Sequence, residues 1–218
     1  MKPRKKLLIV GNGMAAARVV EEILKRAKEQ FDITMFGAEP YGNYNRILLS
    51  NVLNGTQSAT DIFMNPLAWY EENNIKLHAG VKVTQIDREK RIAVGTPLTP
   101  NAIAYATDSE NAKMPVVKET YDHVIIATGS RPFVPPMEGF GDTGTFLFRT
   151  IDDCARIANY AKARKRAAVI GGGLLGLEAA RGLLTHGVEV TVIEACPQLM
   201  AMQLDAESGN LLRTSIEG

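Results

Sequence analysis

Two stretches of the sequence predict an α/β fold with two domains, each built on a parallel β-sheet. Residues 8–20, LIVGNGMAAARVV, and residues 169–184, VIGGGLLGLEAARGLL, each read as a buried strand, a glycine-rich turn and a helix. A further apolar strand follows each helix, at residues 31–37 and 188–194. A strand, a helix and a parallel strand in this order form a right-handed unit. Two such units predict two Rossmann-like domains.

The first unit begins with a short apolar strand at residues 6–10, followed by a helix at residues 14–30. One stripe along this helix is apolar, which predicts that the helix packs on the sheet. The stripe consists of Ala16, Val19, Val20, Ile23, Leu24 and Ala27. Beyond it, residues 62–74 predict a short helix that opens near Pro66, and residues 75–95 predict short β segments.

The middle of the chain separates the two units. Residues 96–120 are polar, contain three prolines and predict an exposed loop or a hairpin extension. Residues 123–130 read as another buried strand, and the proline- and glycine-rich residues 131–144 read as a connection. We therefore expect a first domain over residues 1–143 and a second over residues 144–218.

The second domain is expected to start with a helix that Thr150 or Asp152 caps. The second unit follows, with a strand, a helix, a strand and a further helix at residues 167–171, 174–186, 188–194 and 204–216. A doubly wound half needs more parallel strands than these to cover its sheet. We therefore expect this domain to be incomplete and the chain to belong to a longer polypeptide. Its exposed strand edges would favour pairing with another copy, as a homodimer.

The composition argues against several classes of partner. The formal net charge of the 218 residues is +1, so the chain lacks the basic excess of a nucleic-acid-binding protein. It has no apolar run of about 18 residues that could span a membrane. Cys154 and Cys196 form no C-x-x-C motif, and no spacing predicts a metal site. A cytoplasmic protein with reduced thiols is the expectation. Cys154, Met200 and Met202 are expected to be packing residues.

Both glycine turns fit the spacing G-x-G-x-x-G, or its variant with alanine in the third place. The first turn has Gly11, Gly13 and Ala16, and the second has Gly171, Gly173 and Gly176. Glycines let the backbone approach a pyrophosphate, and the following helix offers free N–H groups and the positive end of its dipole. The alternative is that these glycines only let a helix pack tightly on a strand.

An acidic residue after the second strand of each unit is the candidate partner of a ribose. Glu194 lies 18 residues beyond Gly176, close to the expected spacing of about 20. In the first unit Glu39 is the nearest candidate, and its alternative role is an exposed turn residue beside Pro40. Two nucleotide sites in one chain would let one cofactor pass a hydride to another.

The pair of turns, joined by VIIATGSRPFVPP, resembles the FAD- and NAD(P)-dependent pyridine nucleotide oxidoreductases with two dinucleotide-binding folds. The segment EPYGNYNRILLSNVLNG, residues 39–55, is most similar to the N-terminal flavin region of the NAD(P)H-dependent nitrite reductase large subunit. This resemblance covers nearly the whole chain. It implies that the first turn binds FAD and the second binds NAD(P)H. Hydride would then pass from NAD(P)H to FAD. Because Glu194 would accept from a 2′-hydroxyl and repel a 2′-phosphate, we expect NADH to be preferred over NADPH.

The resemblance implies roles for individual residues. Glu39 would hold the FAD ribose, Arg46 would face the FAD phosphates or the flavin edge, and Val83 would meet the adenine through its backbone. Glu178 resembles a glutamate near the nicotinamide amide and is the candidate catalytic residue. The remaining cofactor contacts would come from Gly11, Gly13, Ala15, Ala16, Ser50, Asn51, Thr128, Gly129 and Arg131 for FAD, and from Gly171, Gly173, Leu174, Leu175 and Gly176 for NAD.

Two positions differ from the family pattern and limit which groups could exchange protons or electrons with FAD. Asn51 stands where ferredoxin reductases often carry a lysine, so no ion pair with Glu178 can form. No cysteine precedes Cys154, whereas the disulfide-reductase branch carries C-x-x-x-x-C in its first domain. Electrons are therefore expected to leave FAD for an acceptor other than an active-site disulfide.

The resemblance implies nitrite reduction, through an iron–sulfur and sirohaem region, as the terminal use of these electrons. A reductase of ferredoxin or rubredoxin is one alternative, and a non-catalytic FAD-binding scaffold or redox sensor is another. Reduction of bound flavin by NADH would separate an enzyme from a scaffold. We expect the 218 residues alone to retain FAD weakly or not at all, and not to turn over NADH.

Overall fold

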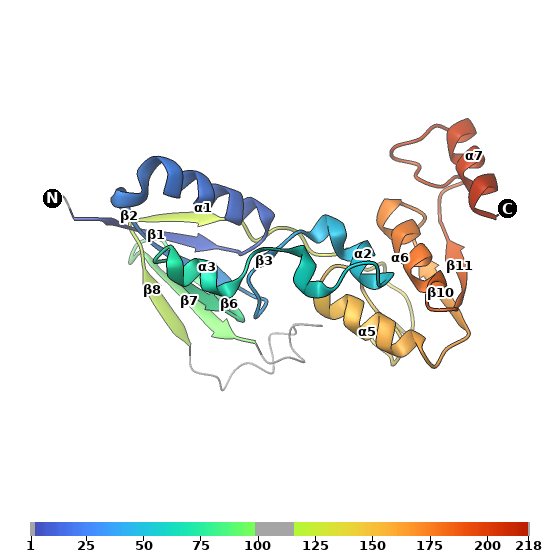
Figure 1. The fold of residues 1–218 in the computed structure, drawn as a ribbon, viewed down its shortest axis with the longest axis horizontal. Helices are drawn as coiled ribbons and strands as arrows, with labels where there is room; N and C mark the ends of the chain where they lie inside the picture. Colours follow the sequence, from blue (N-terminus) through green and yellow to red (C-terminus); the bar gives the residue numbers. More distant parts are fainter. Residues whose placement is uncertain (1–2, 99–115, 218) are drawn as a thin grey trace. The chain divides into compact units, whose positions relative to one another are not determined.

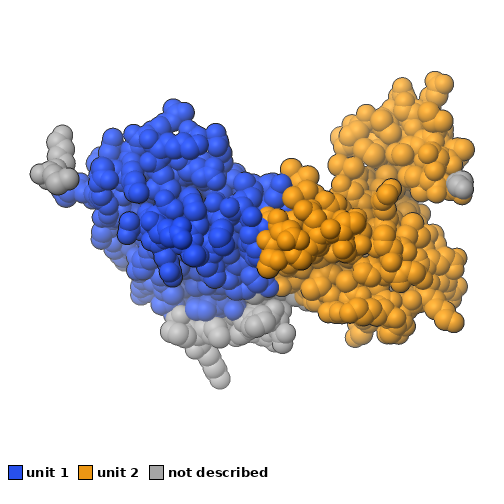
Figure 2. Space-filling model, in the orientation of Figure 1, with its two compact units in different colours: residues 1–45, 63–131 blue, residues 46–62, 132–218 orange. Residues whose placement is uncertain are grey.

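The computed structural model describes residues 3–98 and 116–217 (Figure 1). The contacts divide the chain into two compact units, coloured separately in Figure 2. The first unit combines Met1–Asn45 with Phe63–Arg131, and the second combines Arg46–Ile62 with Pro132–Gly218.

The first unit contains a parallel sheet with the strand order β5-β2-β1-β9. Its strands are β1 (Lys5–Val10), β2 (Phe31–Gly37), β5 (Lys76–Ala79) and β9 (His123–Ile126). Helix α1 (Met14–Ala27) and a 3-10 turn at Lys28–Gln30 connect β1 to β2. These elements confirm the first strand–helix–strand unit.

Strand β1 is buried on both faces, as its apolar run predicts. Leu7 and Ile9 pack with Ala16 and Val20 of α1, which lies over one face of the sheet (Figure 1). Leu8 and Val10 point the opposite way because side chains alternate along a strand. On that face they pack with Phe36, Val81, Ala93 and Tyr121. The unit therefore holds one core on each side of β1.

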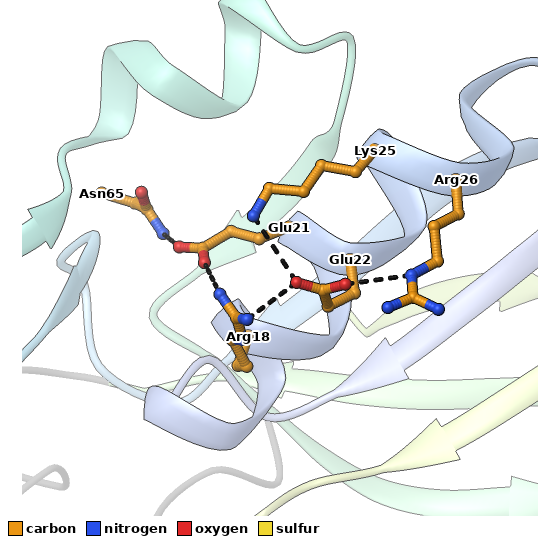
Figure 3. A network of polar contacts seen from close by, with 6 residues as sticks. All are labelled: Arg18, Glu21, Glu22, Lys25, Arg26 and Asn65. Carbon is orange, nitrogen blue, oxygen red and sulfur yellow. Dashed lines mark hydrogen bonds and ion pairs between the residues drawn. The ribbon is translucent and has the colours of Figure 1, made fainter.

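The outer face of α1 carries a network of charged side chains (Figure 3). Glu22 pairs with Arg18, Lys25 and Arg26 at 2.8, 3.5 and 3.0 Å. These pairs span three or four residues, the spacing that places side chains side by side on a helix. The helix is thus amphipathic, as its sequence predicts.

Three antiparallel strands, β6 (Val81–Asp87), β7 (Ile92–Pro97) and β8 (Val117–Thr120), cover the other face. Strand β8 pairs with β7, so the hairpin extension expected within residues 96–120 is confirmed for these four residues. Residues 99–115 of that expected loop lie outside the described residues.

Two very short strands, β3 (Asn43–Tyr44) and β4 (Phe63–Asn65), form an antiparallel pair. Helix α3 (Leu67–Glu72) begins directly after Pro66. The helix expected over residues 62–74 is therefore correct near Pro66 but too long. Residues 63–65 form a strand because they pair with Asn43 and Tyr44.

The second unit contains the parallel pair β10 (Arg166–Ile170) and β11 (Glu189–Ile193), joined by α6 (Leu174–Leu184). This confirms the second strand–helix–strand unit. Its other elements are the 3-10 turns Arg46–Leu48 and Ala59–Ile62 and the helices α2 (Leu49–Leu53), α5 (Ile151–Ala161) and α7 (Ala206–Glu217).

Helix α2 packs against both α5 and α6. A Cβ added to Gly182 of α6 would come within 2.8 Å of the Leu53 side chain of α2, so glycine allows this close approach. Thr150 caps α5, and Asp153 reciprocates by accepting from the Thr150 backbone N–H. Within the described part of the chain, no helix combines the length and apolarity needed to cross a membrane.

Candidate dinucleotide sites at two glycine turns

The first glycine turn lies at the carboxyl end of β1, where ligands bind in open α/β sheets. Gly11 has a φ of +117°, and its N–H donates to the Phe36 carbonyl at 2.8 Å. A Cβ on Gly11 would lie 2.1 Å from the Ala127 carbonyl oxygen and 3.0 Å from the Thr128 nitrogen. Glycine is therefore required, and the end of β9 is brought against the turn.

Gly13 occupies the N-cap of α1 in an ordinary extended conformation, with a φ of −86°. A Cβ at this position would meet no atom of the described residues within 4 Å. No side chain caps α1, and its first turn carries no acidic residue. Helix α5 differs in both respects, because Thr150 caps it and Asp152 and Asp153 stand in its first turn. The N-terminus of α1 thus faces open space with its first N–H groups uncapped.

The second turn repeats this geometry. Gly171 has a φ of +110°, and its N–H donates to the Ile193 carbonyl at 2.8 Å. Gly173 caps α6 with no side-chain bond, and a Cβ there would again meet nothing within 4 Å. Gly176 is needed for packing, since its Cβ would lie 1.9 Å from the Gly171 carbonyl oxygen. Ala16, which is buried, holds the equivalent place in the first turn.

These two turns fit a diphosphate. Each combines open space beside the second glycine with uncapped N–H groups at the positive end of a helix dipole. The packing alternative accounts for Gly176 and Gly11, whose added Cβ atoms would collide with backbone. It does not account for Gly13 and Gly173, where a side chain would meet no protein atom.

The two candidate ribose acids are held by hydrogen bonds. Glu194 accepts from the N–H groups of Gly172 at 2.6 Å and Cys196 at 2.8 Å. Bonds from the Cys196 and Gly172 backbone lower the pKa of the Glu194 carboxyl, which is therefore ionised at neutral pH. Glu39 accepts from the Tyr44 hydroxyl at 2.5 Å. Contact of either acid with a ribose stays a prediction.

The other residues predicted to contact FAD fall in both units. Ala15, Thr128, Gly129 and Arg131 are exposed in the first unit, and Val83 is half-buried there on β6. Ser50 is half-buried in α2 of the second unit.

Two more of these residues, Arg46 and Asn51, belong to the second unit. Arg46 donates to the Arg149 carbonyl at 2.9 Å, and Asn51 donates to the Gln57 side chain at 2.9 Å. The residues predicted at the nicotinamide all lie on the first turns of α6. Leu174 and Leu175 are exposed, and Glu178 is half-buried.

The cysteines differ in environment. Cys154 is buried and its thiol donates to the Leu49 carbonyl at 3.5 Å. Burial, together with the Asp153 charge, raises the pKa of this thiol to about 12, so Cys154 is a packing residue as expected. Cys196 is exposed. Met202 is 90% exposed, so its expected packing role is wrong. Among the described residues, no cluster of histidine, cysteine or acidic side chains could hold a metal ion.

The first turn is surrounded by a polar network that the sequence does not predict, made by Asn12, Tyr41, Asn43 and Tyr70. The one available signal is the asparagine between Gly11 and Gly13. Its partners come from segments more than 25 residues away, and no local pattern predicts that they meet.

The fold and the two turns define a protein of the class with two Rossmann-like dinucleotide-binding regions. Comparison with known families gives the assignment. The chain belongs to the pyridine nucleotide-disulphide oxidoreductase family, whose sequence model matches residues 5–217.

Two known relatives are much longer than this chain. It is 47% identical over 214 residues to a nitrite reductase [NAD(P)H] of Bacillus subtilis, covering 98% of the chain and 24% of that protein. It is 42% identical to an assimilatory nitrate reductase electron transfer subunit of the same organism, again over 98% of the chain and 25% of the relative. The chain thus spans about a quarter of the length of both relatives.

A solved structure has the same fold. The NADH:rubredoxin oxidoreductase of Clostridium acetobutylicum superposes with a TM-score of 0.80 at 26% identity. The match covers 99% of this chain and 51% of the oxidoreductase. The α/β fold with Rossmann-like parallel sheets, predicted from the sequence, is confirmed.

Proposed function

We propose that this chain is the FAD- and NAD-binding module of an NADH-dependent reductase. Residues 1–143 would provide the FAD-binding region and residues 144–218 the NAD-binding region. The observation that carries this proposal is the repeated turn: Gly13 and Gly173 each leave open space at an uncapped helix N-terminus.

For FAD, the N–H groups at the start of α1 would bind the diphosphate, and Glu39 would accept from the ribose hydroxyls. When bound, FAD supplies an acceptor for hydride and a donor of single electrons. Thr128 and Gly129 extend from β9 next to Gly11, a position that lets them border this cofactor.

For NAD, the start of α6 would bind the diphosphate and Glu194 the adenosine ribose. The ionised Glu194 carboxylate would accept from a 2′-hydroxyl and repel a 2′-phosphate, which favours NADH over NADPH. Leu174 and Leu175 are exposed on α6 and would form apolar walls beside the nicotinamide. Glu178, one turn further on, would orient the nicotinamide amide.

The electrons would pass onward to an iron–sulfur and sirohaem region in nitrite reduction. The name of the Bacillus subtilis relative at 47% identity supports this use. A ferredoxin or rubredoxin acceptor is the second candidate, favoured by the rubredoxin oxidoreductase fold. Both cysteines are free thiols, which agrees with a location in the reducing cytoplasm. Pairing of two copies also stays a prediction.

Two matched variants test the assignment of the turns. Gly13→Glu should abolish FAD binding, measured by quenching of flavin fluorescence, because the carboxylate fills the phosphate space and repels the phosphates. Gly173→Glu should keep FAD and lose NADH binding. Equal FAD affinity in wild type and Gly13→Glu would refute the FAD site.

A further inference from the structure

The middle residue of the first turn, Asn12, is held by side chains and backbone from other segments. The Tyr70 hydroxyl donates to Asn12 Oδ1 at 2.7 Å, and Asn12 Nδ2 donates to the Tyr41 carbonyl at 3.3 Å. These two bonds fix the Asn12 side chain. A third bond acts on its backbone, because Asn43 Nδ2 donates to the Asn12 carbonyl at 3.3 Å.

The bond from Asn43 determines the direction of the next N–H group. The described residues contain no cis peptide bond, so the peptide from Asn12 to Gly13 is trans. In a trans peptide the carbonyl and the following N–H point in opposite directions. Holding the Asn12 carbonyl toward Asn43 therefore directs the Gly13 N–H away from Asn43. Gly13 is the residue beside which a Cβ would meet no protein atom.

The second turn holds the corresponding carbonyl by a different group. The Gly172 carbonyl accepts from the Met200 N–H at 3.0 Å. Met200 has a φ of +51°, a conformation that costs energy for a residue other than glycine. The same peptide is therefore anchored in both turns, although the donor is a side chain in one and a strained backbone in the other.

Burial of the Asn43 side chain destabilises the fold, so a purely structural role does not explain it. It is 0% exposed, and its Oδ1 has no hydrogen-bond partner among the described residues. An unpaired buried carbonyl destabilises the fold. Its backbone N–H donates to the Tyr70 hydroxyl at 3.2 Å, a bond that does not need the amide side chain. The hydrogen bond that does need the amide side chain is the one from Asn43 Nδ2 to the Asn12 carbonyl.

We propose that Asn43 is a positioning residue for the diphosphate at the first turn. It orients the peptide from Asn12 to Gly13 so that the Gly13 N–H is preset to donate to a phosphate oxygen. This inference rests on the proposed function, because it takes the first turn to be the FAD diphosphate site.

The test compares Asn43 with its cross-strand neighbour Asn65 in the full-length protein. Asn65 pairs with Asn43 across β3 and β4, is 5% exposed, and donates to Glu21 rather than to the turn (Figure 3). Asn43→Leu should raise the dissociation constant for FAD by about tenfold to a hundredfold. This is the effect of losing a hydrogen bond to a charged group, here the bond from the Gly13 N–H to a phosphate oxygen. Asn65→Leu should change it by less than about threefold at a similar loss of stability.

Two further measurements separate positioning from folding. Asn43→Ala removes the donor without introducing a charge, so it should weaken FAD binding to a similar extent. The phosphorus NMR resonances of bound FAD should shift in both Asn43 variants and stay unchanged in Asn65→Leu.

Wild-type affinity and unchanged phosphorus resonances in a folded Asn43 variant would overturn this inference and leave the proposed function intact. Unfolding of both Asn43 variants would also overturn it, because Asn43 would then serve the fold. Failure of the wild-type protein to bind FAD would instead overturn the proposed function, and this inference with it.

Discussion

At the scale of single residues, Gly11 and Gly13 stand in one turn for different reasons. An alanine at Gly11 would need a left-handed conformation and would collide with the Ala127 carbonyl. An alanine at Gly13 would meet nothing in the protein and would suit its φ of −86°. The fold thus requires the first glycine, whereas the second would serve the ligand of the proposed site.

We therefore expect Gly11→Ala to lower the free energy of unfolding by about 2 kcal/mol or more. Gly13→Ala should change it by less than about 1 kcal/mol but weaken FAD binding. Chemical denaturation and flavin fluorescence measure the two effects separately. Equal loss of stability in both variants would show that the space beside Gly13 is not free.

Glu194 is the residue that sets coenzyme choice in this account. Glu194→Ala removes the carboxylate, so in the full-length enzyme the preference for NADH over NADPH should fall by about tenfold, measured as the ratio of their kcat/KM values. Glu189→Ala provides the control, because Glu189 is exposed at the start of β11, the strand that Glu194 directly follows. A wild-type enzyme that prefers NADPH would contradict the role of Glu194.

At the scale of elements, α5 depends on its cap. Thr150 Oγ1 accepts from the Asp153 N–H at 3.1 Å, while Asp153 accepts from the Thr150 N–H at 2.8 Å. Thr150→Ala should cost about 1 kcal/mol of unfolding free energy. Thr150→Ser keeps the hydroxyl and should restore most of it. If the alanine and serine variants unfold at the same denaturant concentration, the cap contributes nothing.

Strand β8 is tied to β5 by one carboxylate. Glu119 accepts from Lys76 at 2.6 Å and from His78 at 2.7 Å, and His78 stacks on Phe36. Burial raises the pKa of the Glu119 carboxyl, but the hydrogen bonds from Lys76 and His78 outweigh it and hold the pKa below its ordinary value of 4.5.

This lowered pKa gives a pH dependence with a definite sign. A carboxyl with a lower pKa in the folded state stabilises the fold above its ordinary pKa and loses that effect as pH falls further. Glu119→Gln should therefore cost about 1 kcal/mol at neutral pH, and this cost should shrink progressively as the pH falls below 4.5. Glu89→Gln is the exposed control. A cost for Glu119→Gln that does not change with pH would contradict this explanation.

The helices and strands that the sequence predicts are those whose apolar residues follow a clear pattern, either a continuous run or a helical repeat. The strands around each glycine turn and helices α1 and α6 follow from apolar runs and an apolar stripe. Strands β3 and β4 have two and three residues, too few for any alternation to be visible. Asn43 was missed for the same reason, because its role depends on pairing with segments distant in the sequence.

At the scale of the whole molecule, two repeated turns in one chain are the feature that requires explanation. Each turn leaves open space at a helix N-terminus that no side chain caps, and the absence of cysteine before Cys154 leaves no disulfide pair in the first half of the chain. The chain covers about a quarter of its nitrite reductase relative. We therefore propose that this module moves electrons from NADH to FAD for use by another part of the enzyme or by a partner protein.

Anaerobic titration of the FAD-loaded full-length protein with NADH tests that claim most directly, with the visible absorbance of the flavin as the signal. We expect stoichiometric bleaching in the wild type and no bleaching in Gly173→Glu, which keeps FAD but cannot bind NADH. Flavin absorbance that stays unchanged while NADH binds to the wild-type protein would contradict the account and favour a non-catalytic scaffold.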